Sequence, residues 1–377
     1  MPLPAAPVFF LGQTLTKRDL LAPVGAARQA GGERPPGLLL SWDHVHAEGV
    51  DEGAADAAPL DPVLADPGAT RYGRDTIQRK DAAPWIQRRA PKDDYDWTAL
   101  IDEALAAQRA LSAPAHIIPS VTLTQTDWPD GVQVALDAAR RAAKQRPQGD
   151  PEAFVRVTVD DPWITDARFR RTLLNQVTDL PEDLEVALHV RWSRSAALGD
   201  EACVANLRTV VEALAGDGRR VLMVEAGALG WLAIGWGAWG FTAGLAQSTW
   251  LRSTEQIRRS KGQPATRVEW YFEPRLLHRV RRATHQRLAG RSDYQPCSCA
   301  FCQRLVPGGA GTWDLDLAAQ HALYSLAALT DQVAAPRLAD RHARVLAAVR
   351  DAQAYADNLG LRGEPRPAHL QAWLNQL

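Results

Sequence analysis

Three of the chain's four cysteines fall within six residues, Cys297–Cys302, in a Cys-x-Cys-x-x-Cys pattern. A histidine, His321, follows on a segment with helical periodicity, with eighteen residues between it and Cys302. Three thiolates and one imidazole complete a closed tetrahedral zinc site. We therefore expect a structural Zn²⁺ ion bound by Cys297, Cys299, Cys302 and His321. A disulfide or free thiols are the alternative for the cysteines, and His285 is the replacement candidate for the fourth ligand.

The composition is that of a globular protein. The chain has 377 residues, of which 46% are hydrophobic and 23% charged, with a formal net charge of −1. No run of eighteen apolar residues is present, so we expect no membrane-spanning helix. The start of the sequence lacks a basic leader followed by a long apolar run, and cysteines are few. We therefore expect a cytoplasmic protein.

Short apolar runs alternate with helical patterns over the first 250 residues. Runs that are apolar throughout are typical of parallel strands buried on both faces. We expect seven strands and a possible eighth, namely Val8–Leu11, Leu38–Ser41, His116–Leu123, Phe154–Val159, Leu184–Val190, Val221–Val224 and Gly240–Leu245, with Arg267–Tyr271 last. This alternation predicts an α/β fold, a (β/α)8 TIM-like barrel. Neither a Gly-x-Gly-x-x-Gly pattern nor a Walker A motif supports an open sheet instead.

We expect three parts: the barrel over 1–265, a basic zinc-binding subdomain over 266–330, and C-terminal helices packed on the barrel over 331–377. The segment Ala47–Pro91 is rich in glycine and proline, which favours a lid or a substrate-covering loop.

Two helices are expected in the tail, over Arg337–Asn358 with Gly360 as its C-terminal cap and over Ala368–Leu377. Apolar positions of the second, such as Leu370 and Trp373, indicate either a homodimer contact or intramolecular core.

Basic residues gather ahead of the cysteines. The stretch Leu251–Arg291 holds eleven Lys or Arg and three acidic residues, and Arg71–Lys92 holds seven against two. A local excess of this size suits a polyanion, because phosphate contacts supply much of the affinity for nucleic acid. Solvated helix faces are the alternative.

The cysteine segment Gln295–Cys302, with His321-Ala-Leu-Tyr-Ser-Leu after it, resembles the zinc subdomain of the tRNA-guanine transglycosylase superfamily. The opening Pro7–Thr14 also looks like that family's first barrel strand, and the order of the motifs agrees over roughly residues 7–330. The resemblance implies a zinc site beside a (β/α)8 barrel. It also implies exchange of a guanine base for a 7-deazaguanine in tRNA or, in related enzymes, in DNA. A somewhat short gap before the histidine indicates a divergent branch.

The implied exchange uses two carboxylates, one to attack C1′ of the nucleoside and one to handle protons. Asp43, at the end of the second expected strand, matches the proton-handling position. The strand that would carry the nucleophile, Gly240–Thr249, holds no Asp or Glu. Other candidates at strand ends are Glu225 and Asp160, although the Asp160-Asp161 pair is more typical of a turn that caps the next helix.

Candidate substrate contacts are Arg191, for a phosphate or a base, and Gln247, for a base edge; a surface role for Arg191 is the alternative. Of His189 and Arg191 on one strand, we expect only one to face the interior. The leading functional hypothesis is a transglycosylase-like protein acting on guanine or 7-deazaguanine nucleotides in tRNA or DNA. The alternatives are an inactive zinc-containing barrel that binds nucleic acid or a partner protein, and a barrel hydrolase or lyase.

Overall fold

The computed structural model describes residues 3–13, 20–41, 60–67, 69–71, 94–123, 130–145, 150–192, 199–244, 269–305, 313–363 and 365–377. Asp43 and Gln247 lie outside these described residues, as does almost all of the basic stretch Arg71–Lys92.

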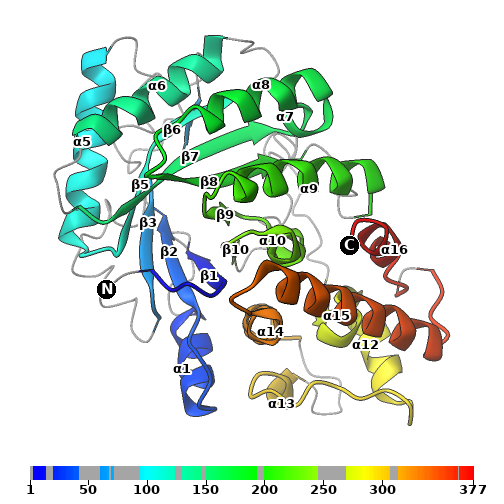
Figure 1. Ribbon diagram of the computed structural model, residues 1–377. Helices are drawn as coiled ribbons and strands as arrows, with labels where there is room; N and C mark the ends of the chain where they lie inside the picture. The colour runs from blue at the N-terminus through cyan, green and yellow to red at the C-terminus, as the bar shows by residue number, and fades with distance from the viewer. Residues whose placement is uncertain are drawn as a thin grey trace, which may run out of the picture.

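A single sheet of parallel strands forms the centre of the molecule (Figure 1). Hydrogen bonding in the described residues connects the strands in the order β3-β2-β1-β10-β9-β8-β7-β6-β4, with β5 paired to β7. Only two residues separate β3 from β4, the two ends of this path, so the sheet forms a nearly closed barrel of eight parallel strands in which β3/β4 and β5/β6 each count as one. The strands are β1 Val8–Gln13, β2 Gly37–Ser41, β3 Val63–Asp66, β4 Ala69–Arg71, β5 Ala115–Ile118, β6 Ser120–Leu123, β7 Glu152–Asp160, β8 Leu184–Arg191, β9 Val221–Met223 and β10 Gly240–Gly244.

All seven expected strands are present. The prediction of Arg267–Tyr271 as a possible eighth barrel strand was wrong. Residues Trp270–Glu273 form β11, which pairs antiparallel with β12 (His278–Arg281) in a separate two-stranded sheet. The remaining barrel strand is β3/β4, from within the segment expected to be a lid. Two short runs interrupted by Pro67 carry little periodicity, because proline cannot donate to the sheet.

Helices cover the outside of the barrel in the described residues, as Figure 1 shows for α5 to α9. Aspartates cap two of them: the side chains of Asp166 and Asp200 accept hydrogen bonds from the first-turn N–H groups of α8 and α9. The helices are α1 Ala22–Ala30, α5 Asp94–Ala110, α6 Asp130–Gln145, α7 Pro162–Thr165, α8 Ala167–Thr178, α9 Glu201–Gly216 and α10 Gly227–Ala233, the last followed by the 3₁₀ turn η3 Ile234–Trp236.

Alternate strand residues fill the barrel interior. The part of the interior nearer the start of the strands is an apolar cluster that includes Phe10, Leu39, Phe154, Leu222 and Trp239, each at most 4% exposed. The intervening residues pack outward against the helices in a second, larger core. Burial on both faces explains the continuous apolar runs of the sequence.

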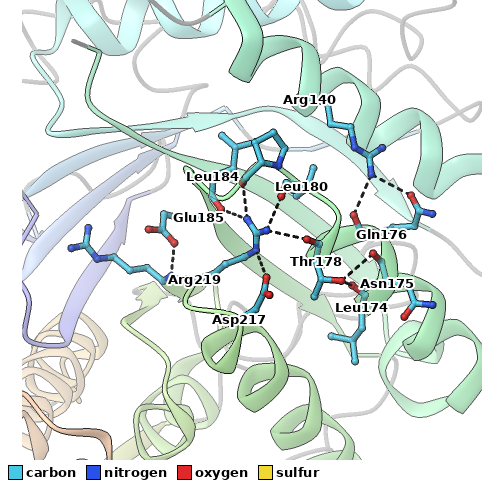
Figure 2. A network of polar contacts seen from close by, with 12 residues as sticks. Arg140, Leu174, Asn175, Gln176, Thr178, Leu180, Leu184, Glu185, Asp217 and Arg219 are labelled. Atoms are coloured by element: carbon cyan, nitrogen blue, oxygen red, sulfur yellow. Dashed lines mark hydrogen bonds and ion pairs between the residues drawn. The ribbon is translucent and has the colours of Figure 1, made fainter. Parts of the chain in front are cut away.

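Arg219 fixes the base of the barrel, at the end where the strands begin (Figure 2). Its guanidinium donates to the carbonyl oxygens of Leu184 and Leu180, at 2.6 and 2.8 Å, and pairs with Asp217 at 2.9 Å. Further bonds reach the carbonyls of Thr178 and Pro181. These contacts tie together the two loops that lead into β8 and β9.

The C-terminal helices gather beside the barrel in Figure 1. Helix α14 packs against β1, α1 and α10, and it extends across the expected domain boundary at residue 330. Leu370 and Trp373 on α16 are fully buried, so the intramolecular alternative for these side chains is confirmed. No helix among the described residues is both long and apolar enough to cross a membrane. The helices are α12 Arg282–Ala289, α13 Cys302–Leu305, α14 Leu315–Val333, α15 Leu338–Asn358 and α16 His369–Leu374.

Candidate metal centre and barrel mouth

The four expected metal ligands lie together. The sulfur atoms of Cys297, Cys299 and Cys302 and a ring nitrogen of His321 are all within 4.8 Å of one another. Nδ1 of His321 is 3.3 Å from Sγ of Cys299 and 3.1 Å from Sγ of Cys302. All three thiols are free, so the disulfide alternative was wrong. The group is close enough to bind a metal ion.

Local structure explains how the ligands converge. Cys302 begins the short helix α13, and the backbone N–H of Gln303 bonds back to the carbonyl of Cys299 at 3.2 Å. This turn places the sulfur atoms of Cys299 and Cys302 on the same side of the backbone, where both face Nδ1 of His321. Helix α14, capped by the side chain of Asp314, presents His321 to them from two turns inside its N-terminus.

The neighbours of His321 fix which of its nitrogens faces the sulfurs. Nε2 lies 2.6 Å from the carbonyl oxygen of Phe272, so it carries the proton and donates. Nδ1 is then the lone-pair nitrogen, as metal binding requires. Tyr271 stacks on the imidazole, with ring centroids 4.5 Å apart and planes 9° apart, and its hydroxyl is 3.1 Å from Sγ of Cys302.

His285 is not a ligand in this arrangement. Its ring stacks on Tyr271 at 3.7 Å, and its Nδ1 is 3.0 Å from the Tyr294 hydroxyl. Burial lowers the pKa of His285 to about 4, so the ring is neutral at pH 7. His285, the replacement candidate, therefore packs on Tyr271 beside the centre, while His321 faces the thiols.

The crowded thiols shift each other's pKa. Hydrogen bonds from the Cys297 and Cys302 thiols lower the pKa of Cys299 to about 3, while hydrogen bonding to Cys297 and Cys299 together with burial raises the pKa of Cys302. One negative charge is thus easy to place on the cluster and further ones are costly. A bound divalent cation removes that cost, because it stabilises every thiolate that it contacts.

An acidic and a basic residue of the barrel meet where the strands end. Asp160 ends β7 and Arg191 ends β8; Oδ1 of Asp160 is 2.8 Å from Nε of Arg191 and 2.8 Å from the nearer terminal nitrogen. Asp161 is the N-cap residue that immediately precedes helix α7, but its side chain makes no capping bond. Asp161 thus lies in the turn before a helix but does not cap that helix with its side chain, and Asp160 is engaged by Arg191.

Glu225 follows β9 in an unusual backbone conformation. Its φ angle is +53°, in the left-handed region that side chains other than glycine, asparagine and aspartate rarely adopt. Its N–H donates to Oγ1 of Thr242 on β10, at 2.7 Å. The carboxylate is one-third exposed and its Oε2 is 3.8 Å from Nε2 of His189. Strained backbone of this kind is often found at functional sites.

We call the end of the barrel where the strands end the barrel mouth. Sequence reasoning missed two charged residues that lie inside the barrel below this mouth, toward the start of the strands. Arg156, on β7, is 3% exposed and pairs through one terminal nitrogen with Asp66 of β3 at 2.9 Å. Its other terminal nitrogen is 3.0 Å from Nδ1 of His189. An arginine within an apolar run, as in Phe-Val-Arg-Val-Thr-Val, was the available signal, because such a residue must find polar partners inside.

The expectation that only one of His189 and Arg191 faces the interior was wrong. Residues two apart on a strand point to the same side, and both side chains meet partners on neighbouring strands inside the barrel. The tryptophans Trp231, Trp236 and Trp239 are at most 4% exposed, so they pack in the core.

Several described arginines of the basic segment are held within the C-terminal part. Arg275 stacks on Tyr355 at 4.0 Å, Arg282 pairs with Glu269 at 3.1 Å, and Arg291 pairs with Asp293 at 2.6 Å. These contacts favour a structural role for part of the charge excess.

No protein-family model matches the chain, and no curated protein sequence matches it significantly. The geometry of the two sites therefore carries the functional argument.

Proposed function

We propose that this chain is a transglycosylase-type protein that binds a guanine or 7-deazaguanine nucleotide of tRNA or DNA at the barrel mouth. The observation that carries the proposal is the placement of two carboxylates, Asp160 and Glu225, at the ends of strands on either side of β8. Strand β8 supplies Arg191, which pairs with Asp160, and His189, which faces Glu225. Enzymes with parallel barrels carry out their chemistry at this end of the barrel. The proposal includes TIM-type (β/α)8 connectivity.

In the proposed reaction Glu225 is the candidate nucleophile. Its carboxylate attacks C1′, the C1′–N9 bond breaks, and the departing base takes a proton from a second acid. The incoming base gives up its N9 proton and displaces the carboxylate, which restores the nucleoside. Asp160 and Asp43 are the candidates for the proton carrier. Glu225 suits attack because it is the more exposed of the two carboxylates in the described mouth.

The proposed metal is zinc. Three sulfur ligands and one imidazole match its preference, and four protein ligands leave no position for substrate. The ion's role is then structural: it would tie the cysteine turn to α14, which packs on β1. A reducing cytoplasm keeps the thiols available.

Nucleic acid is the proposed partner. Arg281 and Arg287 are exposed on the C-terminal part, each beside a residue of the same module, Trp270 and Thr284. Guanidinium groups on this surface can hold phosphates without a buried charge cost.

The test is incorporation of labelled guanine into tRNA and into DNA by the wild type, by Glu225→Gln and by Glu212→Gln. Glu212 is an exposed residue on α9 that pairs only with its helix neighbour Arg208 in the described contacts, which makes it the matched control. We expect incorporation into one polymer by the wild type and the control, and a loss of at least 100-fold in Glu225→Gln. No incorporation into either polymer by the folded wild type contradicts the proposal.

A barrel that binds without catalysis is the second candidate. Asp160 is held by two bonds from Arg191, and the described residues of β10 offer Thr242 as their one polar side chain. In that case tRNA or DNA binding, measured by fluorescence anisotropy, would be retained while no label is incorporated.

A further inference from the structure

Four residues form a continuous polar chain across the inside of the barrel. Asp66 of β3 pairs with Arg156 of β7, Arg156 contacts His189 of β8, and His189 faces Glu225 after β9. The functional proposal uses only the last two residues of this chain, His189 and Glu225. Arg156 is the most buried of the four, with 4% of its side chain exposed, against 14% for Asp66 and for His189 and 33% for Glu225.

Arg156 is held by two hydrogen-bond contacts and one ion pair. Nε donates to Oγ1 of Thr158 at 3.2 Å, one terminal nitrogen meets Asp66 at 2.9 Å, and the other is 3.0 Å from Nδ1 of His189. A guanidinium carries only donors and stays protonated in proteins. The atom that it meets on His189 must therefore be an acceptor.

We infer that Arg156 is a positioning residue that holds His189 as the Nε2–H tautomer. With Nδ1 occupied as an acceptor, the single ring proton sits on Nε2, the nitrogen 3.8 Å from Oε2 of Glu225. The pair thus presents an N–H donor and a carboxylate acceptor side by side. Asp66 acts one step further away, because it holds Arg156 in place by charge.

This arrangement has a consequence for the mouth. A proton on Nδ1 would set two N–H donors against each other inside the barrel. His189 therefore serves as a neutral hydrogen-bond donor that orients the Glu225 carboxylate or a ligand acceptor. The inference does not depend on which ligand binds, since it concerns the protein alone.

The tautomer is read directly by long-range ¹H–¹⁵N NMR of the full chain labelled at histidine. The sequence has nine histidines, and the His189 signals are identified as those missing from His189→Gln. We expect a single Nε2–H form in the wild type. In Arg156→Gln the ratio of Nε2–H to Nδ1–H should fall about tenfold or more, since one charged hydrogen bond is lost.

Two further variants separate this role from general packing. Asp66→Asn should shift the ratio in the same direction but less, and Arg156→Lys, which keeps a donor, should shift it less than Arg156→Gln. Arg109→Gln, which removes an ion pair to Asp150 at the base of the barrel, should leave it unchanged. An Nδ1–H form in the wild type overturns the inference even if Arg156→Gln does not fold, and so does an unchanged ratio in folded Arg156→Gln.

Discussion

The cysteine centre and the barrel mouth both gather polar groups, but they are built in opposite ways. Three of the four groups in the centre come from one six-residue turn, and the stacked rings of Tyr271 and His285 pack beside them. The groups of the mouth come from strands far apart in the sequence, and each is held by an oppositely charged or hydrogen-bonding partner. The centre is suited to stabilise the fold, and the mouth to meet a ligand.

The same contrast applies to exposure. In the centre, His321 and Cys302 are at most 2% exposed, whereas the side chain of Glu225 at the mouth is 33% exposed. Cys297 and Cys299 are half-buried, but four protein ligands complete a tetrahedral site and leave no position for substrate. Packing does not explain why the accessible carboxylate of Glu225 lies on strained backbone. Variants in the two regions should therefore separate stability from activity.

The largest effect is expected from Cys302→Ser. Loss of one thiolate from a closed site weakens metal binding about 100-fold or more, and the free energy of unfolding should fall by on the order of 5 kcal/mol, since metal affinity is folding energy here. Elemental analysis and urea unfolding measure both. Cys203→Ser, at a half-buried thiol of α9 outside the cluster, is the control. One bound metal per chain retained in Cys302→Ser would contradict the assignment of the centre.

Glu273, behind the centre, should make stability depend on pH. Burial raises the pKa of this carboxyl from 4.5 to about 7 in the folded chain, and Tyr294 donates a hydrogen bond to it. The folded state keeps the proton to a higher pH than the unfolded state, so the contribution of this carboxyl to stability is greatest below pH 4.5 and is lost as the pH rises through 7. The loss attributable to this residue is about 3 kcal/mol.

Urea unfolding at pH 5 and at pH 7.5 tests this, with Glu273→Gln as the comparison. Metal binding depends on pH in both proteins, so the relevant quantity is the difference between them. The wild type should lose stability relative to Glu273→Gln over this range. A constant difference would show that the carboxyl is already ionised in the folded state.

The contrast between the regions also explains what the sequence could reveal. The cysteine centre was predicted with all four ligands, because spacing along the chain sets its geometry. Seven barrel strands were predicted because residues buried on both faces leave continuous apolar runs. The β3/β4 strand was missed because two runs broken by Pro67 resemble a loop. Arg156 had a signal in the sequence, an arginine within an apolar run, but its pairing with Asp66 depends on strand positions in space and could not be predicted from the spacing of residues along the chain.

A smaller effect is expected from Asp160→Asn at the mouth. The substitution removes the charge opposite Arg191 in a partly buried pair, so the free energy of unfolding should fall by about 1 kcal/mol. Asp340→Asn breaks an exposed pair with Arg337 and should change it by less than about 0.5 kcal/mol. Equal losses in the two variants, measured by urea unfolding, would show that the Asp160–Arg191 pair is no more than a surface contact.

The smallest effect has the opposite sign and concerns Glu225. Asparagine tolerates the left-handed conformation better than glutamate, so Glu225→Asn should raise the free energy of unfolding by about 0.5–1 kcal/mol while it removes the mouth carboxylate. Glu225→Gln removes the same charge but keeps the strained side-chain type, and should leave stability nearly unchanged. Urea unfolding of both variants measures the difference. If both stabilise the chain equally, the cost at this position arises from the charge and not from the backbone, and the strain argument for a functional mouth is lost.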